Sequence, residues 1–443
     1  MIFAKTFSRG GIHPFDRKDE TRSKEIWNAA IPSECIVPLR QHIGAPAECL
    51  VSKGDEVREG QLIGRAGSFV SANVHAPIPG SVTEIRSIFL PNGVESPAVV
   101  IALSGEFDRL GKRGTRREWE DLMPEELLEI IREKGVVGMG GATFPTHVKY
   151  SVPRGKRAEF LIANGTECEP YLSADHRLML ERSDGILEGL QIGRRILGVD
   201  KVSIGIENNK PDAIDHMRRR IRELGLDFSV VPLEEKYPQG GEKQLIETIC
   251  GREVPSGGLP IDIGVIVSNT ATLYAMYEAV VYDKPLIERV LTVSGGAVRN
   301  PANLKVRIGT SMAELFEEAG GFREVPQKVV AGGPMTGQAV YDLDTPVGKG
   351  SSGVLALTPG EVNNAPQTPC INCGRCVRSC PVGLTPTLLY KLIEHEEYQD
   401  AVSLGLNDCI ECGACSFICP AHIPLVQGIR IGKRIARKKK VKP

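Results

Sequence analysis

The chain reads Cys370-Ile-Asn-Cys-Gly-Arg-Cys-Val-Arg-Ser-Cys-Pro381 and, further on, Cys409-Ile-Glu-Cys-Gly-Ala-Cys-Ser-Phe-Ile-Cys-Pro420. Both stretches follow the pattern C-x2-C-x2-C-x3-C-P, and together they hold eight of the 12 cysteines. Three thiolates on one tight loop can reach three irons of a cubic cluster, whereas the fourth lies past a turn and points away. This spacing predicts two [4Fe–4S] clusters, whose common work is the movement of single electrons.

The same pattern is the signature of bacterial two-cluster ferredoxins, in which the fourth cysteine of each run ligates the other cluster. We therefore expect a ferredoxin-like, α-helical domain that binds two clusters. Cluster one is assigned to Cys370, Cys373, Cys376 and Cys419. Cluster two is assigned to Cys409, Cys412, Cys415 and Cys380.

Two other uses of cysteine fit these runs less well. Disulfides are disfavoured because no secretory signal opens the chain, and intracellular thiols stay reduced. Structural zinc needs only four ligands per site and usually shows two separated C-x2-C pairs. We expect most of the remaining cysteines to be ordinary buried thiols. They are Cys35, Cys49, Cys168 and Cys250.

The overall composition is that of a globular protein. A length of 443 residues is too long for one hydrophobic core, and the hydrophobic and charged fractions are 41% and 25%. The formal net charge of −1 provides no field that would favour nucleic acid. Because no apolar run approaches a membrane span and residues 1–11 lack a secretory core, we expect a cytoplasmic location.

The C-terminal end is a local exception, because it is rich in lysine and arginine from Arg430 onward and has no acidic residue there. We expect residues 429–443 to form a basic tail. Such a tail is either disordered and solvated or in contact with anionic lipid headgroups or an acidic partner.

Residues 1–115 are expected to form a domain of short strands. Turn signals at Lys53-Gly54 and Glu59-Gly60 precede the segment 74–82. This pattern resembles the barrel-sandwich fold of lipoyl and biotinyl carrier domains, which hold a modified lysine on a hairpin tip. The tip expected here, residues 71–73, reads Ser-Ala-Asn and has no lysine. The resemblance therefore implies a structural or docking module rather than a swinging arm.

Residues 116–285 alternate helical and strand patterns, which predicts a Rossmann-like α/β layer with a parallel sheet. Helices are expected at 124–134, 184–197, 212–224 and 271–281, and strands at 160–163, 202–206 and 264–267. Residues 286–358 predict a small α+β unit that resembles the β-grasp domain called SLBB. The cluster-binding domain is expected over 359–428, beginning with a linker, so that the chain is α/β and multidomain.

A glycine-rich loop runs from Gly138 through Gly140 and Gly141 to Phe144, and Lys149 follows it. It comes after a predicted helix and lacks a Lys-Ser/Thr pair, so neither the dinucleotide fingerprint nor the P-loop fits. Closely spaced glycines let backbone lie against a flat ring and turn N–H groups toward a phosphate. We therefore expect a flavin here, with Lys149 near its phosphate and Phe144 offering an aromatic face.

A second polar segment, Asn164-Gly-Thr-Glu167-Cys-Glu169-Pro170, follows the strand predicted at 160–163. The carboxyl ends of parallel strands are where α/β folds place ligands. Asn164 has the groups to bond a flavin ring edge, and Glu167 and Glu169 can bond ribose hydroxyls or order water. Alone this segment is better explained as a polar turn, but together with the glycine loop and the clusters it favours a flavin site.

These two segments are similar to the FMN- and NADH-binding subunit of respiratory complex I. That family carries a G-x-G-G-x-G-F-P-type loop and an Asn-x-Asp-Glu-x-Glu-Pro-type segment, where this chain has Thr143 for a glycine and Thr166 for the aspartate. The resemblance implies FMN and NAD(H) as cofactors. It also implies cofactor contacts at two further strand ends, which are Glu207 with Asn208 and Asn269 with Thr270.

From about residue 7 to 422 the chain resembles the RnfC family, whose members are part of the Rnf complex. That family shows, in the same order, the start Gly10-Gly-Ile-His-Pro14, a carrier-like domain without lysine, a flavin domain, an SLBB-like domain and two cluster motifs. The resemblance implies a peripheral protein on the cytoplasmic side of a membrane, partnered by other Rnf subunits. It implies a translocase that couples electron flow between ferredoxin and NAD(H) to Na⁺ or H⁺ transport, with Glu169 and Glu207 placing the nucleotide.

Three alternatives stay open. A cobalamin reductase resembles the flavin, SLBB and cluster parts, but such reductases tend to begin at the flavin motif. A diaphorase subunit of a soluble hydrogenase or dehydrogenase is the second. The third is a non-catalytic electron wire, in which the α/β region is a docking scaffold and the glycines only form turns.

Overall fold

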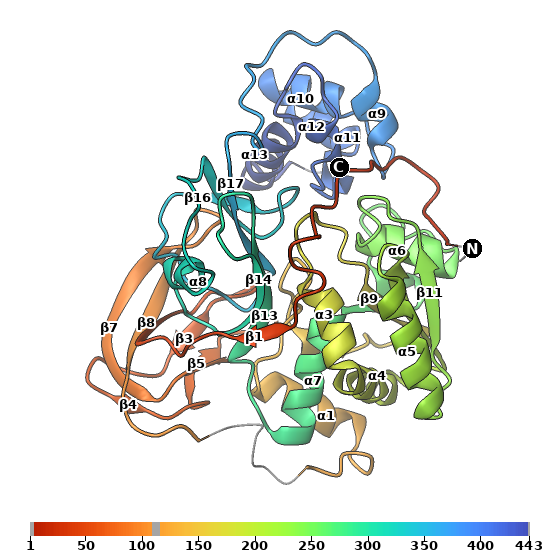
Figure 1. The fold of residues 1–443 in the computed structure, drawn as a ribbon. Helices are drawn as coiled ribbons and strands as arrows, with labels where there is room; N and C mark the ends of the chain where they lie inside the picture. Colours follow the sequence, from red (N-terminus) through yellow and green to blue (C-terminus); the bar gives the residue numbers. More distant parts are fainter. Residues whose placement is uncertain (1–3, 109–115, 442–443) are drawn as a thin grey trace.

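The computed structural model describes residues 4–108 and 116–441, which form four packed units (Figure 1). In Figure 1 a β-barrel lies at the left, an α/β unit at the lower right, a mixed sheet between them and a small helical domain on top. The predicted α/β multidomain fold class is confirmed by this arrangement. The predicted domain end at residue 115 and the basic residue Lys442 lie outside the described residues.

The barrel is built from two small antiparallel sheets. One has the order β2 (Glu34–Pro38), β8 (Glu95–Leu103), β7 (Gly80–Phe89) and β4 (Glu56–Val57). The other has the order β3 (Ala47–Cys49), β5 (Leu62–Ala66) and β6 (Val74–His75). Ile63 and Ile101 are fully buried between them, because every second side chain of a strand faces the interior.

The hairpin tip that would bear a modified lysine in a carrier domain is buried here. Ser71 and Ala72 are inaccessible, and the Asn73 side-chain amide donates to the carbonyl of Glu133 (3.1 Å). The Nζ of the buried Lys349 donates to the carbonyls of Asn73 (2.6 Å) and Gly135 (2.7 Å). The tip is thus held by hydrogen bonds to the neighbouring units and serves as a structural contact, not as a swinging arm.

Residues 4–28 lie outside the two barrel sheets, and the predicted N-terminal domain over residues 1–115 stays a prediction. β1 (Ile26–Asn28) pairs in parallel with β14 (Ala302–Arg307) of the mixed sheet. We call residues 5–24 the N-terminal strap; it crosses the α/β unit as the red trace in Figure 1. Its backbone groups bond to other units, as in the exchange between Ile12 and Tyr237 (2.8 and 2.9 Å).

The α/β unit has a parallel sheet in the order β11 (Ser229–Leu233), β10 (Lys201–Glu207), β9 (Phe160–Gly165) and β12 (Val265–Asn269). Its helices are α1 (Pro124–Glu133), α2 (Thr146–Tyr150), α3 (Ala174–Glu181), α4 (Ser183–Leu197), α5 (Pro211–Glu223), α6 (Glu242–Cys250) and α7 (Thr270–Tyr282), with a 3₁₀ turn at Pro260–Ile263. The elements predicted from sequence are present at closely similar bounds. β11, α2, α3 and α6 were not predicted.

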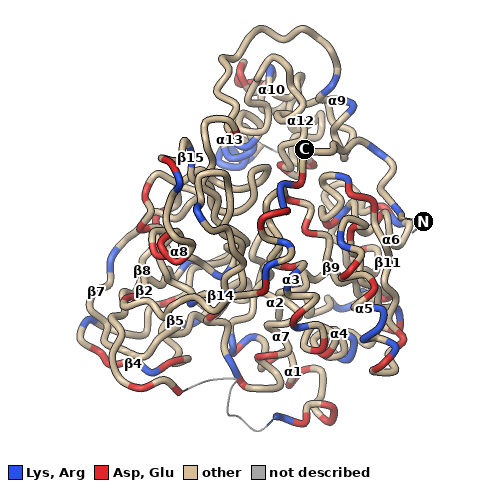
Figure 2. The backbone as a smooth tube through the Cα atoms, in the orientation of Figure 1, with Lys and Arg blue, Asp and Glu red and all other residues tan. Residues whose placement is uncertain are grey.

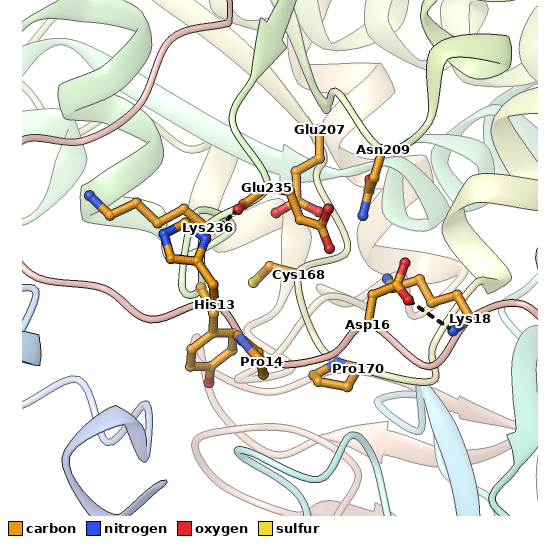
Figure 3. Close-up of a pocket in the computed structure, with 11 residues that line it drawn as sticks. His13, Pro14, Asp16, Lys18, Cys168, Pro170, Glu207, Asn209, Glu235 and Lys236 are labelled. Carbon is orange, nitrogen blue, oxygen red and sulfur yellow. Dashed lines mark hydrogen bonds between the residues drawn. The ribbon is translucent and has the colours of Figure 1, made fainter. Parts of the chain in front are cut away.

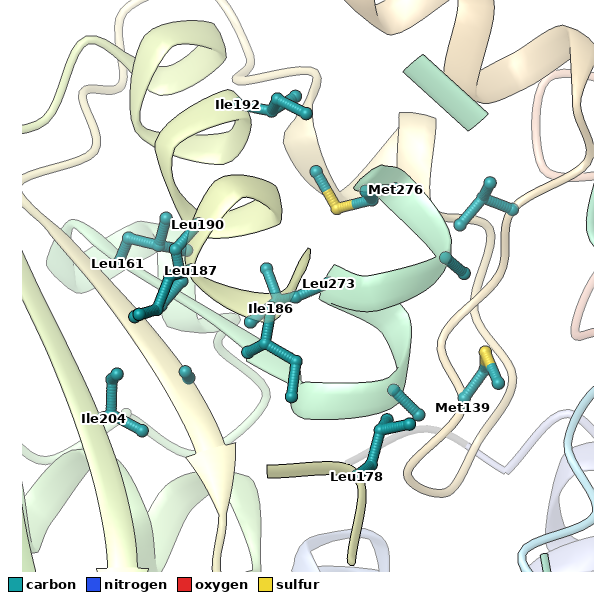
Figure 4. Close-up of a cluster of buried hydrophobic side chains, with 14 of the residues drawn as sticks. Met139, Leu161, Leu178, Ile186, Leu187, Leu190, Ile192, Ile204, Leu273 and Met276 are labelled. Carbon is teal, nitrogen blue, oxygen red and sulfur yellow. The ribbon is translucent and has the colours of Figure 1, made fainter. Parts of the chain in front are cut away.

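α4 and α7 pack tightly in the core of this unit (Figure 4). A Cβ on Gly189 would lie 2.0 Å from the carbonyl oxygen of Leu273, so glycine permits the close approach of the two helices. Leu187 and Leu190 on α4 are fully buried, as is Met276 on α7. This packing supports the sheet edge from which the ligand-binding loops rise.

The mixed sheet has the order β1-β14-β13-β17-β15-β16. Its further strands are β13 (Glu288–Ser294), β15 (Lys328–Ala331), β16 (Gln338–Val340) and β17 (Gly353–Leu357). α8 (Met312–Glu318) buries Met312, Leu315 and Phe316 in the core of this unit. It begins with a capping box, because the Ser311 hydroxyl accepts from the Glu314 N–H (3.2 Å) and the Glu314 carboxylate accepts from the Ser311 N–H (3.0 Å).

The cysteine-rich domain consists of short helices. They are α9 (Arg375–Ser379), α10 (Pro386–Glu394), α11 (Tyr398–Ser403), α12 (Ala414–Phe417) and α13 (Leu425–Lys438), with a 3₁₀ turn at Leu406–Asp408. The prediction of a basic tail over 429–443 is wrong, because α13 continues to Lys438 and buries Ile429 and Ala436. Apolar residues at helical spacing place these basic residues on a packed helix.

Candidate functional site

Two cavities in the cysteine-rich domain are each lined by four cysteines. The cluster-one cavity, of about 130 Å³, is lined by Cys370, Cys373, Cys376 and Cys419. The cluster-two cavity is lined by Cys380, Cys409, Cys412 and Cys415. Each takes three cysteines from one run and the fourth from the other, which is the grouping predicted above. Four converging thiols fit a [4Fe–4S] cube, and the individual ligand assignments stay predictions.

The two cysteine runs follow the same backbone course. Asn372 and Glu411 occupy matched positions with φ of +54° and +57°. The Asn372 N–H donates to the Cys370 sulfur and the Glu411 N–H to the Cys409 sulfur, both at 3.4 Å. Hydrogen bonds of this kind favour the charge of a bound thiolate and tune cluster potentials.

The surroundings of the two cavities differ. Burial raises the pKa of the Cys412 and Cys415 thiols to about 12. Cluster ligands are thiolates, so cluster binding must release these protons. By contrast, Ile371 in the first run follows Cys370 directly and is 67% exposed beside the cluster-one cavity. The cluster-two cavity is therefore the more enclosed of the two.

The predicted flavin residues meet at the carboxyl ends of three parallel strands. Asn164 at the end of β9 is in register with Asn269 at the end of β12 and with Gly205 of β10. Glu207 ends β10. Adjacent strands thus deliver polar side chains to one edge of the sheet, which is where α/β folds bind ligands.

The glycine loop lies against the start of α7 at this edge. A Cβ on Gly140 would come within 2.8 Å of the Asn269 Cβ, so glycine allows the contact. A Cβ on Gly141 would meet nothing within 4 Å, which leaves that side of the loop open. The Thr270 hydroxyl at the start of α7 is buried without a partner among the described residues. An open glycine face beside an unpaired polar group fits a phosphorylated ring such as FMN.

Lys149 lies at the same edge, but its ammonium group already has partners. Its Nζ is 2.7 Å from the Glu242 carboxylate and 2.7 Å from the carbonyl of Val267, near the end of β12. Glu242 begins α6 and was not predicted from sequence. The proposed contact of Lys149 with the flavin phosphate stays a prediction, and Glu242 would compete for the same cation.

The two acidic residues of the second segment are held by backbone amides. Glu167 accepts from the N–H groups of Asp175 (2.7 Å) and His176 (3.1 Å) at the start of α3. Glu169 accepts from the N–H groups of Met335 (3.0 Å) and Thr336 (2.9 Å) in the mixed-sheet unit. One carboxylate therefore caps a helix and the other joins two units. Their predicted nucleotide contacts stay predictions.

Asn164, Asn208 and Asn269 also make internal bonds. The Asn164 amide donates to the carbonyl of Gly240 (2.9 Å), and the Asn208 side-chain oxygen accepts from the Glu235 N–H (3.1 Å). Asn269 caps α7 by accepting from the Ala271 N–H (2.9 Å). These bonds fix the three amides at the strand ends, and their cofactor contacts stay predictions.

A cavity of about 150 Å³ opens beside this edge (Figure 3). Its lining residues are His13, Pro14, Asp16 and Lys18 of the strap with Cys168, Pro170, Glu207, Asn209, Glu235, Lys236 and Tyr237. Glu207 is only 1% exposed; its Oε2 is 3.1 Å from Lys210 Nζ, and its Oε1 has no partner within the described parts of the chain. Burial raises the pKa of Glu207. An unpaired buried acceptor beside a cavity fits a ligand hydroxyl or amide.

Sequence reasoning missed how the strap takes part in this site. The Lys18 Nζ donates to the carbonyl of Glu167 (2.5 Å). Gly10, with φ of +65°, lies so close to the cluster-two cavity that a Cβ would come within 2.4 Å of the Cys380 carbonyl oxygen. The glycine pair in Gly10-Gly-Ile-His-Pro14 could have indicated this contact, because glycine permits a left-handed backbone and a close backbone approach.

Two further residues of the site were also missed. The Tyr237 hydroxyl donates to the carbonyl of Cys412 (2.6 Å). The buried Asp175 carboxylate accepts from the Asn269 amide (2.6 Å), and burial raises the pKa of Asp175 to about 7. Neither residue belongs to a local motif, so only the folded chain shows their place.

Known families match each unit of the chain. The matches are the RnfC barrel sandwich hybrid domain at residues 5–106, the Nuo51 FMN-binding domain at 131–278, the SLBB domain at 290–339 and the 4Fe-4S dicluster domain at 362–420. The RnfC-type subunit of the proton-translocating ferredoxin:NAD(+) oxidoreductase complex of Clostridium ljungdahlii is 49% identical over 89% of this chain and 86% of that protein. The chain belongs to the RnfC family.

Other RnfC-family proteins align over almost the whole chain. The corresponding subunit of the ion-translocating oxidoreductase complex of Rhodobacter capsulatus is 45% identical over 96% of this chain and 82% of its own length. That of the Na(+)-translocating ferredoxin:NAD(+) oxidoreductase complex of Acetobacterium woodii is 41% identical over 98% of both chains. A crystal structure of an NAD+-reducing [NiFe]-hydrogenase shares the fold, with a TM-score of 0.52 and 18% identity over 75% of this chain and 66% of that one.

The domain matches confirm the predicted cofactors of this RnfC-family chain, FMN and two [4Fe–4S] clusters. NAD(H) fits the oxidoreductases named among its relatives. Among residues 4–108 and 116–441, no helix has both the length and the apolarity needed to cross a bilayer.

Proposed function

We propose that this chain is the electron-transfer subunit that exchanges electrons with NAD(H) in a ferredoxin:NAD⁺ oxidoreductase of the Rnf type. It would lie on the cytoplasmic side of the membrane as a peripheral subunit, beside the subunits that move Na⁺ or H⁺. Bound FMN supplies the conversion between the single electrons of the clusters and the hydride of NAD(H). The protein contributes binding, orientation and exclusion of water.

One observation carries the proposal: the cluster-two cavity faces the flavin unit. The Tyr237 hydroxyl, whose residue lines the cavity beside Glu207, donates to the carbonyl of Cys412 (2.6 Å). The Gly11 N–H donates to the carbonyl of Ser379 (3.0 Å), next to Cys380. The chain thus joins the flavin edge and cluster two by direct hydrogen bonds.

The contacts of the flavin unit and the strap fall on the cluster-two loops, so we place the cluster-one cavity beyond cluster two in the route. Three of its cysteines, with Cys415 of the cluster-two cavity, pack in a small apolar group with Ala421, Ile423 and Leu425, all from the same domain. The 359–369 linker reaches it through the Thr368 N–H, which donates to the carbonyl of Ala421 (3.0 Å). Electrons would therefore pass from the flavin edge to cluster two and then to cluster one. Cluster one is the outer end of this electron route.

NAD(H) would use the cavity of Figure 3. The unpaired Oε1 of Glu207 offers an acceptor for a ribose hydroxyl or a carboxamide N–H. Of the two lysines that line the cavity, Lys18 donates its Nζ to the carbonyl of Glu167 (2.5 Å), and Lys236 donates its Nζ to the carbonyl of Phe7 (3.0 Å). No side chain has to accept or donate a proton to carbon in a hydride transfer. The role of these residues is therefore placement of the nucleotide.

The decisive test is a titration of the reconstituted chain. Purified protein should bind one FMN and contain roughly eight iron and eight sulfide atoms, the content of two cubes. NADH added without oxygen should bleach the flavin and reduce a cluster, seen by its paramagnetic resonance signal. Protein that binds FMN but transfers no electron from NADH to any cluster would overturn the proposal.

The alternatives are separated by the same preparation. Flavin-free protein that cannot oxidise NADH with an artificial acceptor would favour a pure electron wire. NADH-dependent reduction of cobalamin would favour a cobalamin reductase. Membrane attachment is tested by copurification of the other subunits with this chain.

A further inference from the structure

The surface around the cluster-one cavity has the composition of a protein-docking site. We define the cluster-one face as Ile371 and Asn372, which line the cavity, together with Arg375, Val377 and Arg378 of the adjoining helix α9. Ile371 is 67% exposed and Val377 38% exposed, and the two arginines are also exposed. An apolar centre with a charged rim is the usual anatomy of a protein interface.

The charge on this part of the chain has one sign. From residue 362 to residue 393 the sequence has no aspartate or glutamate, and Arg375, Arg378 and Lys391 are its charged residues. All three side chains are exposed. Figure 2 shows blue segments around α9 without neighbouring red ones on the same loop. This face therefore presents a positive potential that attracts an acidic partner and not a basic one.

The face is also where an electron can enter or leave. The described contacts with the flavin unit and the strap involve the loops of cluster two, at Ser379, Cys380 and Cys412. The first run keeps Cys370 and Cys373 partly exposed beside Ile371. A redox partner that covers Ile371 comes next to cluster one without displacing any of the internal contacts.

We propose that the cluster-one face docks a small acidic iron–sulfur electron carrier, of which a ferredoxin is the type. The proposal rests on the proposed function, because it assigns the outer end of the same electron route to one surface. Arg375 and Arg378 steer the carrier, and Ile371 and Val377 form the dry centre of the contact. Such encounters are small and transient, so charge governs the association rate more than the lifetime.

The exchange at this face moves one electron and nothing else. In the direction tested below, the reduced carrier is oxidised by one electron and the chain is reduced by one electron. No bond forms or breaks, and no proton is transferred. The co-reactant is the reduced carrier itself.

A second positive surface provides a matched control. The exposed Arg434 and Lys438 lie on α13, away from the first cysteine run. Changing both to glutamate alters the net charge by the same amount as changing Arg375 and Arg378. A comparison of the two double variants separates a specific face from the total charge.

The experiment uses the full chain with both clusters and FMN, and a small acidic two-cluster ferredoxin as probe. At low salt, Arg375→Glu/Arg378→Glu should weaken ferredoxin binding about tenfold and slow cluster reduction by reduced ferredoxin by a similar factor. Arg434→Glu/Lys438→Glu should change either quantity less than about twofold. The difference should shrink as salt approaches about 1 M, where screening shortens the reach of charges to a few ångströms.

Two internal checks keep the outcome interpretable. Arg378 donates to the carbonyl of Cys373 (3.2 Å), so the variant's iron content must equal that of the parent, and Arg375→Glu alone should give part of the effect. NADH-driven reduction of flavin and clusters must also be unchanged, which shows that the proposed function stands in the variant.

Three results would overturn the docking proposal while leaving the proposed function intact. One is equal weakening by the two double variants. Another is wild-type protein that is reduced by NADH but does not bind the ferredoxin. The last is loss of binding to vesicles of anionic lipid in Arg375→Glu/Arg378→Glu with an unchanged rate of reduction by ferredoxin, which would make the face a lipid contact.

Discussion

The two cysteine runs have the same spacing and the same backbone course, yet they sit in different surroundings. Around Cys370 the chain is exposed, and Ile371 projects from it. Around Cys412 the chain is covered by Tyr237 and the strap, and burial raises the pKa of the Cys412 thiol. The spacing of the cysteines in each run sets the type of cluster that the run can bind. The neighbouring units decide which of the two clusters is covered and which is exposed.

Removal of the fourth cysteine from each run tests this comparison most strongly. Cys380→Ser should lower iron from roughly eight to roughly four atoms and abolish NADH-driven reduction of the remaining cluster, because cluster two is the link to the flavin. Cys419→Ser should lose as much iron but keep NADH-driven reduction of cluster two. The measurement is paramagnetic resonance after NADH addition. The same loss of reduction in both variants would contradict the order of the route.

The strap contact at cluster two is tested by Gly10→Ala. This residue has φ of +65°, and its new Cβ would lie 2.4 Å from the Cys380 carbonyl oxygen. The left-handed conformation alone costs about 1–2 kcal/mol for an L-residue, and the collision adds to it. We expect a lower unfolding midpoint and faster loss of cluster two in air.

The matched control for this variant is Gly93→Ala. Gly93 has φ of +74°, and a Cβ there would meet nothing within 4 Å. Gly93→Ala therefore has the cost of a left-handed L-residue but no steric clash of the new Cβ. Equal destabilisation by the two variants would show that the strap is not needed at cluster two.

Lys149→Glu tests the flavin end of the route. It places a second carboxylate beside Glu242, so a bound phosphate would meet negative charge, and the affinity for FMN should fall about tenfold or more. Lys156→Glu is the control, because Lys156 also pairs with a carboxylate, Asp262, but lies outside the glycine loop. Flavin fluorescence of dialysed protein gives the affinity. Unchanged retention of FMN would remove Lys149 from the site.

The smallest effect is expected from Tyr237→Phe, which deletes the hydrogen bond to the Cys412 carbonyl. Loss of one such bond costs about 1 kcal/mol of stability. Tyr282→Phe also deletes one hydrogen bond, to Tyr277 (3.1 Å), far from the clusters. Only Tyr237→Phe should shift the midpoint potential of cluster two, while the midpoint potential of cluster one stays constant. Redox titration measures both potentials.

Several features of this molecule were predictable because their causes are local. The cysteine runs, the strand at Phe160–Gly165 and the helix at Thr270–Tyr282 follow from spacing and from apolar periodicity. The basic tail was wrong because charge was weighed above the apolar spacing of Ile429 and Ala436, which packs α13.

The site itself was only partly predictable. Asn164 and Asn269 come together because parallel strands end at one edge, which the pattern implies. The partner of Lys149, Glu242, lies on a helix far along the chain, and Glu169 turns to amides of another unit. No local pattern encodes such pairs, because they depend on how the units pack.

The amino-acid sequence by itself determined the chemistry of this protein: two sets of thiols for iron–sulfur cubes, a glycine loop for a flat ring and the order of the units. Those features need only neighbouring residues and backbone geometry. The tertiary structure alone decided that cluster two faces the flavin edge and cluster one faces outward, because that choice depends on contacts such as Gly10 with Cys380 and Tyr237 with Cys412. Residues far apart in the chain can make such contacts only after the units have packed together.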